Sequence, residues 1–312
     1  VLAVRRPAGE APAARPPTPV QSPDRIRLLA AGLGAILALL GMSRFHGNIT
    51  SEAGHWMWLI GMVVVALSFA VRRPRISRQF FREHRGEILI FCLIMAVAAF
   101  IRAYHLGTFP PGAYLDEADN GLEALRLGDL DYYVPFTRAS NGHPTLYLYM
   151  LHVGFRIFGE GTLAMRLVTG LIGLGTVAGF YFLAREMFGM RAAQCATLAL
   201  AVSRWHVNFS RLVFEGVLTP FWIVLCFLFL ARALRGGQWR DYIWAGLALG
   251  LGLQGYIAYR VFPAIVLLYV VAHLLARRGA LRAWWKGLLA LGVAGLIGFG
   301  PLAAYFLRYP ED

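Results

Sequence analysis

The stretch HPTLYLYMLHVGFRIF, residues 143–158, decides how this chain is threaded through a membrane. It is apolar enough to be mistaken for a transmembrane span, yet it carries His152 and Arg156, whose side chains are costly to bury in hydrocarbon. If the stretch crossed the membrane, the basic connections that follow it would all lie outside. If it lies along the outer interface, they all return to the cytoplasm, as the positive-inside rule requires. We therefore interpret residues 143–158 as an interfacial segment.

The composition of the whole chain is that of a membrane protein. Hydrophobic residues make up 58% and charged residues 15% of the 312 residues, and the mean hydropathy is +0.57. The formal net charge is +13, but the arginines form short clusters between apolar runs, which is the arrangement of cytoplasmic loops. We therefore expect no nucleic acid partner. The three cysteines lie in apolar runs without CxxC spacing, which indicates small buried side chains.

Nine apolar runs approach the length needed to cross about 30 Å of hydrocarbon. They cover residues 26–42, 55–71, 87–103, 164–188, 192–209, 213–234, 242–258, 261–276 and 284–307. Six arginines between residues 72 and 85 give the strongest orientation signal and place that connection in the cytoplasm. The sequence thus predicts an all-α polytopic transmembrane helical bundle with a large first outer loop, residues 104–161, that carries helices beside the membrane.

Three parts of the chain differ in composition. Residues 1–25 are rich in Pro, Ala and Arg, and we expect a disordered cytoplasmic tail. Residues 26–86 hold two N-terminal spans and the basic loop. Residues 87–312 form the main transmembrane module, which includes the outer loop. Because the chain stops just after a span emerges, we expect this module to be incomplete at its C-terminus.

The acidic stretch YLDEADNG, residues 114–121, is the first candidate for a site. A structural explanation is available, because a helix predicted over residues 116–127 would take Asp116 as its N-cap and Glu117 would favour the positive end of its dipole. A carboxylate at a helix start can also act as a general base on a hydroxyl, or help to hold a divalent cation. We predict that Asp116 is catalytic and Glu117 assists it. We assign no metal and keep a divalent cation as the alternative.

Basic and polar residues on the predicted outer side form the second candidate group. An arginine fork can bind phosphate with two hydrogen bonds, whereas the alternative is a structural ion pair or a side chain that reaches the lipid headgroups. Glu215 lies one helical turn beyond Arg211, where the two either pair with each other or serve the site. We predict that the substrate-binding residues are Arg138, His143, Arg166, Arg211, Glu215 and Arg260.

The order of these motifs resembles that of the GT-C membrane glycosyltransferases, particularly the bacterial protein O-mannosyltransferase and aminoarabinose-transferase-like group. The resemblance rests on Asp116-Glu117 soon after a span, His143-Pro144 followed by residues 146–149, Phe158-Gly159, residues 164–167 and 184–189, and Ser210-Arg211 before Glu215. It implies sugar transfer with inversion from a polyprenyl-phosphate donor to a protein, lipid or glycan acceptor. It also implies a bacterial inner-membrane enzyme with an extracytoplasmic site that contains a first-loop aspartate, the position of Asp116.

Two other classes of protein stay as alternatives. A polytopic transporter or lipid flippase would place its charges near the bilayer midplane, often in broken helices, whereas the charges here gather at one face. A non-catalytic membrane assembly subunit would keep the fold without the chemistry. Sugar transfer by the wild type and by Asp116 variants would separate the three hypotheses.

Overall fold

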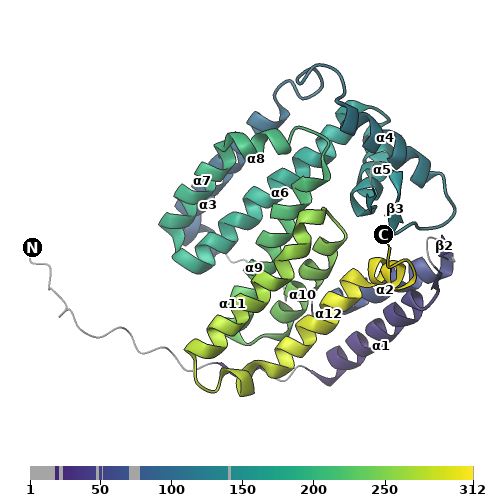
Figure 1. Ribbon diagram of the computed structural model, residues 1–312. Helices are drawn as coiled ribbons and strands as arrows, with labels where there is room; N and C mark the ends of the chain where they lie inside the picture. The colour runs from purple at the N-terminus through teal and green to yellow at the C-terminus, as the bar shows by residue number, and fades with distance from the viewer. Residues whose placement is uncertain are drawn as a thin grey trace, which may run out of the picture.

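The computed structural model describes residues 18–20, 24–46, 49–50, 52–69, 78–139 and 142–311. Over these residues the chain is a bundle of helices with two short antiparallel ribbons, which confirms the predicted all-α fold (Figure 1). The α-helices are α1 (Arg25–Met42), α2 (Glu52–Ser68), α3 (Arg78–Ala103), α4 (Leu115–Gly128), α5 (Leu146–Phe158), α6 (Thr162–Phe188), α7 (Met190–Val202), α8 (Arg204–Phe209), α9 (Leu218–Gly236), α10 (Trp239–Leu253), α11 (Phe262–Ala276) and α12 (Ala280–Arg308). The remaining elements are the 3₁₀ turns η2 (Glu215–Val217) and η3 (Ile257–Val261) and the strands β1 (Phe45–His46), β2 (Ile49–Thr50), β3 (Phe136–Thr137) and β4 (His143–Pro144).

Six helical segments of the described chain are long and apolar enough to cross a membrane. They are Arg25–Met42, Phe81–Ala103, Thr162–Phe188, Glu215–Gly236, Ile257–Ala276 and Ala280–Arg308. The other three runs that we predicted as spans form shorter helices, since α2 has 17 residues, α7 has 13 and α10 has 15. At 1.5 Å per residue these reach only about 20–26 Å. The run 192–209 is divided at Ser203, between α7 and α8.

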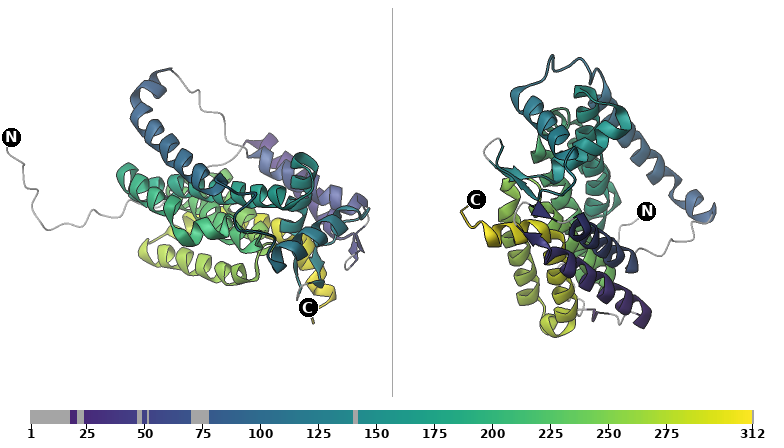
Figure 2. Two further views of the ribbon diagram at one scale, coloured as in Figure 1. Left: turned by 90° about the horizontal axis from the view of Figure 1, so that it is seen from above. Right: turned by 90° about the vertical axis from the view of Figure 1, so that its right-hand side faces the viewer.

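The helices pack both against neighbours in sequence and against helices further along the chain. Helix α1 packs on α2, α6 on α7 and α9, and α10 on α9 and α12, while α3 lies at the edge of the bundle against α6 and α7 (Figure 2). Gly246 and Gly250 of α10 face α12 so closely that a Cβ atom at either position would overlap a carbonyl oxygen of that helix. Small residues thus permit a close α10–α12 contact, as in other membrane bundles.

The N-terminal hairpin formed by α1 and α2 packs on the same bundle. The indole Nε1 of Trp58 in α2 donates a hydrogen bond of 2.8 Å to the carbonyl oxygen of Ile297 in α12. Thr18 and Val20, from the predicted tail, bond to the backbone of Arg235 and Ala283. The rest of that tail up to residue 23, like residues 70–77 of the basic loop, lies outside the described residues.

The predicted outer loop folds into α4, the β3–β4 ribbon and α5, which lie together at one end of the bundle (Figure 1). Helix α5 has 13 residues, about 20 Å, and is too short to span the hydrocarbon. It begins only at Leu146, so His143 and Pro144 precede the helix. Pro144 instead pairs with Phe136, and His143 with Thr137. Proline is tolerated at the edge of such a short ribbon, where no further strand needs its missing N–H.

Candidate functional site

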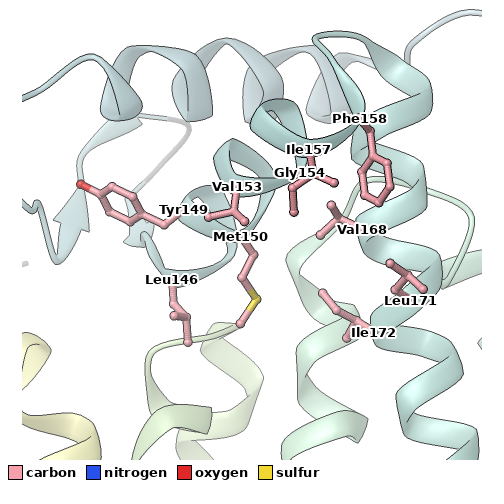
Figure 3. Close-up of a pocket in the computed structure, with 10 residues that line it drawn as sticks. All are labelled: Leu146, Tyr149, Met150, Val153, Gly154, Ile157, Phe158, Val168, Leu171 and Ile172. Carbon is pink, nitrogen blue, oxygen red and sulfur yellow. The ribbon is translucent and has the colours of Figure 1, made fainter. Parts of the chain in front are cut away.

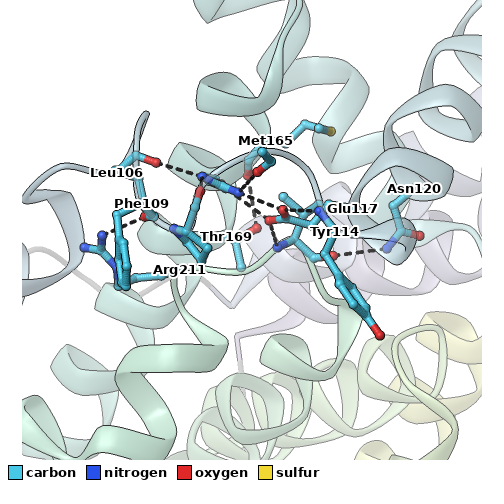
Figure 4. A network of polar contacts seen from close by, with 12 residues as sticks. Leu106, Phe109, Tyr114, Glu117, Asn120, Met165, Thr169 and Arg211 are labelled. Carbon is cyan, nitrogen blue, oxygen red and sulfur yellow. Dashed lines mark hydrogen bonds and ion pairs between the residues drawn. The ribbon is translucent and has the colours of Figure 1, made fainter.

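A buried ion pair joins α4 to α6 beneath the acidic stretch (Figure 4). The guanidinium of Arg166 donates from Nε to Oε1 of Glu117 at 3.1 Å and from Nη2 to Oε2 at 2.8 Å. The two side chains are only 1% and 2% exposed. This two-bond geometry is the strong form of an arginine–carboxylate contact, so it fixes the start of α4 against α6.

Both oxygens of Glu117 also accept backbone hydrogen bonds. The amide of Val213 donates to Oε1 at 2.9 Å, and the amide of Tyr114 donates to Oε2 at 3.1 Å. Burial alone would raise the pKa of Glu117, but the Arg166 guanidinium and these two amides outweigh it and hold the pKa below its ordinary value. The carboxylate is therefore charged and fully engaged, and its geometry suits a positioning role beside Asp116 rather than proton transfer.

Arg166 holds the path of the chain between α3 and α4 as well. Its Nη1 and Nη2 groups donate to three backbone carbonyl oxygens at 2.7–3.2 Å, those of Leu106, Pro110 and Gly112. Together with Glu117 these acceptors use the whole guanidinium, which is almost completely buried. The Arg166 side chain thus stabilises the loop between α3 and α4, whereas we had predicted that it binds substrate.

Arg211 acts on the same stretch from the other side (Figure 4). Its Nη1 donates to the carbonyl oxygens of Ile101 and Arg102 at 2.8 and 3.0 Å, and its Nη2 donates to Phe109 at 2.9 Å. Burial and the nearby Arg166 charge lower the pKa of Arg211. Within the described chain Arg211 forms no ion pair with Glu215, so that alternative of our prediction is wrong. Sequence reasoning missed these contacts because a carbonyl acceptor has no sequence signature.

Asp116 lies in the first turn of α4 with its side chain exposed to solvent. It is not the N-cap that we predicted, because α4 begins at Leu115 and Tyr114 precedes it as the N-cap, with the Tyr114 amide bonded to Glu117. Among the described residues the Asp116 carboxylate makes no hydrogen bond or ion pair. The positive end of the helix dipole stabilises its charge. Asp116 is therefore an accessible carboxylate on a rigidly held helix start.

Glu215 lies beside Asn120 of α4, which follows Asp116 by one helical turn. The Nδ2 group of Asn120 donates to the carbonyl oxygen of Val213 at 3.3 Å and lies 3.5 Å from Oε2 of Glu215. Glu215 is half-buried at the start of η2. Glu215, from a distant part of the sequence, thus lies beside the helix that carries Asp116.

A second polar cluster surrounds Glu123, further along α4, and we did not predict it. Arg126 donates to both oxygens of Glu123 at 2.6–2.7 Å, and the Thr137 hydroxyl donates to Oε1 at 2.6 Å. The Arg126 bonds lower the pKa of Glu123 despite its burial, and Thr137 adds to the effect. His143 faces this cluster as the strand partner of Thr137. The i, i+3 spacing of residues 123 and 126 was the available signal.

Arg138 and Arg260 are brought together at the C-terminal end of α12. Both are exposed. The guanidinium carbon of Arg138 lies 5.7 Å from the ring centre of Tyr309, and that of Arg260 lies 5.1 Å from the ring centre of Phe306. These distances are those of cation–π contacts. The structure thus divides the predicted arginines into two groups: the buried Arg166 and the half-buried Arg211 support the loop, whereas the exposed Arg138 and Arg260 lie against one helix end.

No group of three or more His, Cys, Asp and Glu side chains is placed to hold a metal ion within the described ranges.

Comparison with known proteins identifies relatives of this chain. The family model described as dolichyl-phosphate-mannose-protein mannosyltransferase matches residues 142–305, which include His143, Arg166, Arg211, Glu215 and Arg260. Two Bacillus subtilis (strain 168) proteins are also similar. "Putative mannosyltransferase YycA" is 26% identical over 184 residues, 58% of this chain, and "Putative mannosyltransferase YkcB" is 30% identical over 202 residues, 61% of this chain. Each alignment spans only 27% of the relative's length. No solved structure matches the chain significantly.

Proposed function

Because the chain belongs to the dolichyl-phosphate-mannose-protein mannosyltransferase family of GT-C glycosyltransferases, we propose that this membrane glycosyltransferase moves a sugar from a polyprenyl-phosphate donor to an acceptor hydroxyl, with inversion. The reaction takes place at the outer face of a bacterial plasma membrane. The observation that best supports the proposal is Asp116, an exposed carboxylate on a helix start that the Glu117–Arg166 pair holds in place.

Asp116 acts as the general base in this proposal. Its carboxylate takes the proton of the acceptor hydroxyl as the hydroxyl oxygen attacks the anomeric carbon of the sugar. The bond between that carbon and the donor phosphate oxygen breaks, and the lipid phosphate leaves with the bonding electrons from the opposite face. A single displacement of this kind inverts the sugar carbon. A positioned general base contributes about 10²- to 10⁴-fold in rate.

The exposed arginines Arg138 and Arg260 stabilise the departing phosphate. Two guanidinium forks from different elements, both beside the end of α12, can donate to phosphate oxygens on which charge develops. Glu215 and His143 contribute polar contacts to the substrates from the η2 turn and the β4 strand. Arg166 and Arg211 act indirectly, because their N–H groups shape the loop that leads to Asp116.

The test of this proposal is replacement of Asp116 by Asn in the intact protein. With a radiolabelled mannosyl polyprenyl-phosphate donor, we expect the Asp116→Asn variant to lose at least about 100-fold in the rate of sugar transfer, while the KM for the donor changes little. The matched control is Asp131→Asn, an exposed aspartate after α4, which should transfer at the wild-type rate. Undiminished transfer by Asp116→Asn would refute its role as the base.

A further inference from the structure

Helix α12 contains a proline about two turns before its C-terminal end. Pro301 has no N–H group, so the carbonyl oxygen of Ile297, four residues earlier, lacks its usual helical hydrogen bond. The proline ring also crowds that carbonyl group, and helices bend where this occurs. The last turns of α12 accordingly run in a different direction from the rest of the helix (Figure 2). Residues 302–309, beyond the bend, form a C-terminal arm.

The N-terminal hairpin supplies a partner for this carbonyl group. The indole Nε1 of Trp58 in α2 donates its hydrogen bond of 2.8 Å to the same oxygen of Ile297, across a separation of 239 positions in the sequence. Trp58 and Ile297 are 3% and 1% exposed. A buried carbonyl group without a partner costs free energy, so the Trp58 bond helps to stabilise the bent form of α12. Neighbouring helices commonly satisfy the groups that proline frees in a membrane helix, and here that neighbour is α2.

Two further contacts hold the same turn of α12. Gly300 lies so close to α1 that a Cβ atom there would overlap the side chain of Met42, the last residue of α1. The Nε2 group of Gln254, directly after α10, donates to the carbonyl oxygen of Gly298. Groups from α1, α2 and the end of α10 thus all contact the residues around the bend, and together they set the direction in which the arm leaves the bundle.

Tyr133 connects this network to the outer loop. Its ring stacks beside Trp58 with 6.3 Å between the ring centres, and its hydroxyl bonds to the side chain of Gln254. Tyr133 also packs on Tyr149, whose side chain lies at the Leu146 end of α5 (Figure 3). The hairpin, the outer loop and the bend of α12 therefore form one buried cluster.

The C-terminal arm carries the rings that lie against the two exposed arginines. Phe306 lies against Arg260, and Tyr309 lies against Arg138. Phe136, two residues before Arg138, also packs on the arm, with 5.4 Å between its ring centre and that of Phe306. A change in the direction of the arm would therefore move the rings on which both guanidinium groups lie.

We propose that Trp58 is a positioning residue for the donor phosphate, because its hydrogen bond at the Pro301 bend sets the direction of the arm that supports Arg138 and Arg260. The proposal rests on the function proposed above, since the phosphate site is part of it. Trp58 touches no substrate and acts through α12. The N-terminal hairpin, which precedes the region matched by the family model, thereby takes part in donor binding.

Removal of the indole N–H tests the proposal kinetically. Trp58→Phe keeps an aromatic ring but removes the hydrogen-bond donor, and the matched control is Trp56→Phe, at an exposed tryptophan of the same helix. With a radiolabelled mannosyl polyprenyl-phosphate donor, we expect Trp58→Phe to raise the KM for this donor about tenfold and to leave the KM for the acceptor unchanged. A purely structural loss would reduce the amount of active protein, and thus kcat, without this change in KM. An unchanged donor KM, or the same increase in Trp56→Phe, would overturn the proposal.

Replacement of the proline tests whether Trp58 acts at the bend. Pro301→Ala provides an N–H group, so the Ile297 carbonyl has a helical partner that does not depend on Trp58. In the Pro301→Ala background we therefore expect Trp58→Phe to raise the donor KM less than about twofold, against about tenfold in the wild-type background. Equal effects in the two backgrounds would mean that Trp58 acts elsewhere, which would overturn the proposal.

The direction of the arm is measurable without turnover. Nitroxide labels on Leu289→Cys and Leu307→Cys, at exposed positions on either side of the bend, report the distance across it by pulsed EPR. The intact protein, without its three natural cysteines, is measured in nanodiscs. We expect a shifted or broader distance distribution in Trp58→Phe and the wild-type distribution in Trp56→Phe. Identical distributions in the two variants would overturn the proposal. If the distribution changes but the wild type transfers no sugar, the proposed function fails while the control of the arm by Trp58 stands.

Discussion

Glu117 and Asp116 are neighbours in sequence, yet they have different surroundings. Glu117 receives four hydrogen bonds and is buried, while Asp116 is exposed one residue earlier on the helix. The sequence indicated that the acidic stretch is special and that its members divide in role. It could not show that Glu117 pairs with Arg166, because the partner lies 49 positions away and any of several arginines would satisfy the same charge.

Breaking the buried pair should destabilise the whole loop. In the Arg166→Met variant, Glu117 keeps its charge but loses its partner, and removal of one member of a buried ion pair costs about 3–5 kcal/mol. We expect a clearly lower Tm in detergent, and a double variant with Glu117→Met that is less destabilised than the sum of the single changes. The control is Arg156→Met, an exposed arginine of α5. A Tm equal to that of this control would contradict the role of the pair.

The stability of the protein should also depend on pH through Glu117. Its pKa in the folded protein lies below the ordinary value, so its contribution is complete above the unfolded pKa of about 4.3 and is lost as the pH falls through the folded pKa. We therefore expect the Tm of the wild type to fall more steeply than the Tm of Glu117→Gln as the pH is lowered from about 5 to 3. These two pH values lie about one unit above and below the unfolded pKa. Parallel Tm curves for the two proteins would show that another group controls acid unfolding.

Among the elements, the N-terminal hairpin makes the least expected contact. Tyr133 of the outer loop stacks on His55 of α2 with 4.5 Å between the ring centres and lies 4.8 Å from the ring of Tyr149. Its hydroxyl donates to Oε1 of Gln254 at 3.3 Å. We had placed residues 26–86 outside the main module, since an apolar span gives no sequence signal of its neighbours. The contact shows that α2 helps to hold the segment that leads to β3.

Loss of this contact should loosen the β3–β4 ribbon. In Tyr133→Leu the aromatic pairs, worth about 0.5–1.5 kcal/mol each, are removed. We expect amide hydrogen exchange at residues 134–139 to become about tenfold faster. Tyr132→Leu is the matched control, because Tyr132 is adjacent and more exposed. If both variants exchange alike, Tyr133 contributes no more than any tyrosine of this loop.

The element boundaries show where sequence reasoning succeeded. All nine apolar runs contain helices, because hydrophobicity over many residues is a strong signal. The break at Ser203 and the end of α10 at Leu253 depend on local backbone geometry and packing, which the composition of a run does not encode. Likewise, His143-Pro144 forms a strand because β3 lies opposite it, and such a long-range pairing has no local signature.

At the scale of the whole molecule, charge is divided between the two ends of the bundle. At the predicted cytoplasmic end, Glu186 pairs with Arg232 and Arg235, and Glu87 pairs with Arg185. These partly exposed pairs link α3, α6 and α9. Surface pairs contribute little stability, about 0–1 kcal/mol each, so the excess of arginine at this end is mainly an orientation signal.

Cysteine labelling should test this orientation. In a background where the three natural cysteines are replaced by serine, Asp131→Cys should react with an impermeant maleimide on intact cells. Arg191→Cys, at the start of α7, should react only after permeabilisation. We expect this result because α5 is too short to cross the membrane. The chain then returns to the cytoplasm through α6, which ends just before Arg191. Labelling of both positions on intact cells would mean that residues 143–158 cross the membrane.

The hydrogen bonds from Arg166 and Arg211 to the chain between α3 and α4 determine which residues of that segment can be substituted. Four backbone carbonyl oxygens of residues 104–114 accept hydrogen bonds from Arg166 and Arg211, which lie far away in the sequence. Every amino acid has a backbone carbonyl oxygen, so these hydrogen bonds do not depend on the side chain at the accepting position. The exposed residues Phe109 and Ala113 can therefore vary while the backbone keeps its course, whereas Gly112, whose φ of +73° favours glycine, and the buried Leu106 are constrained.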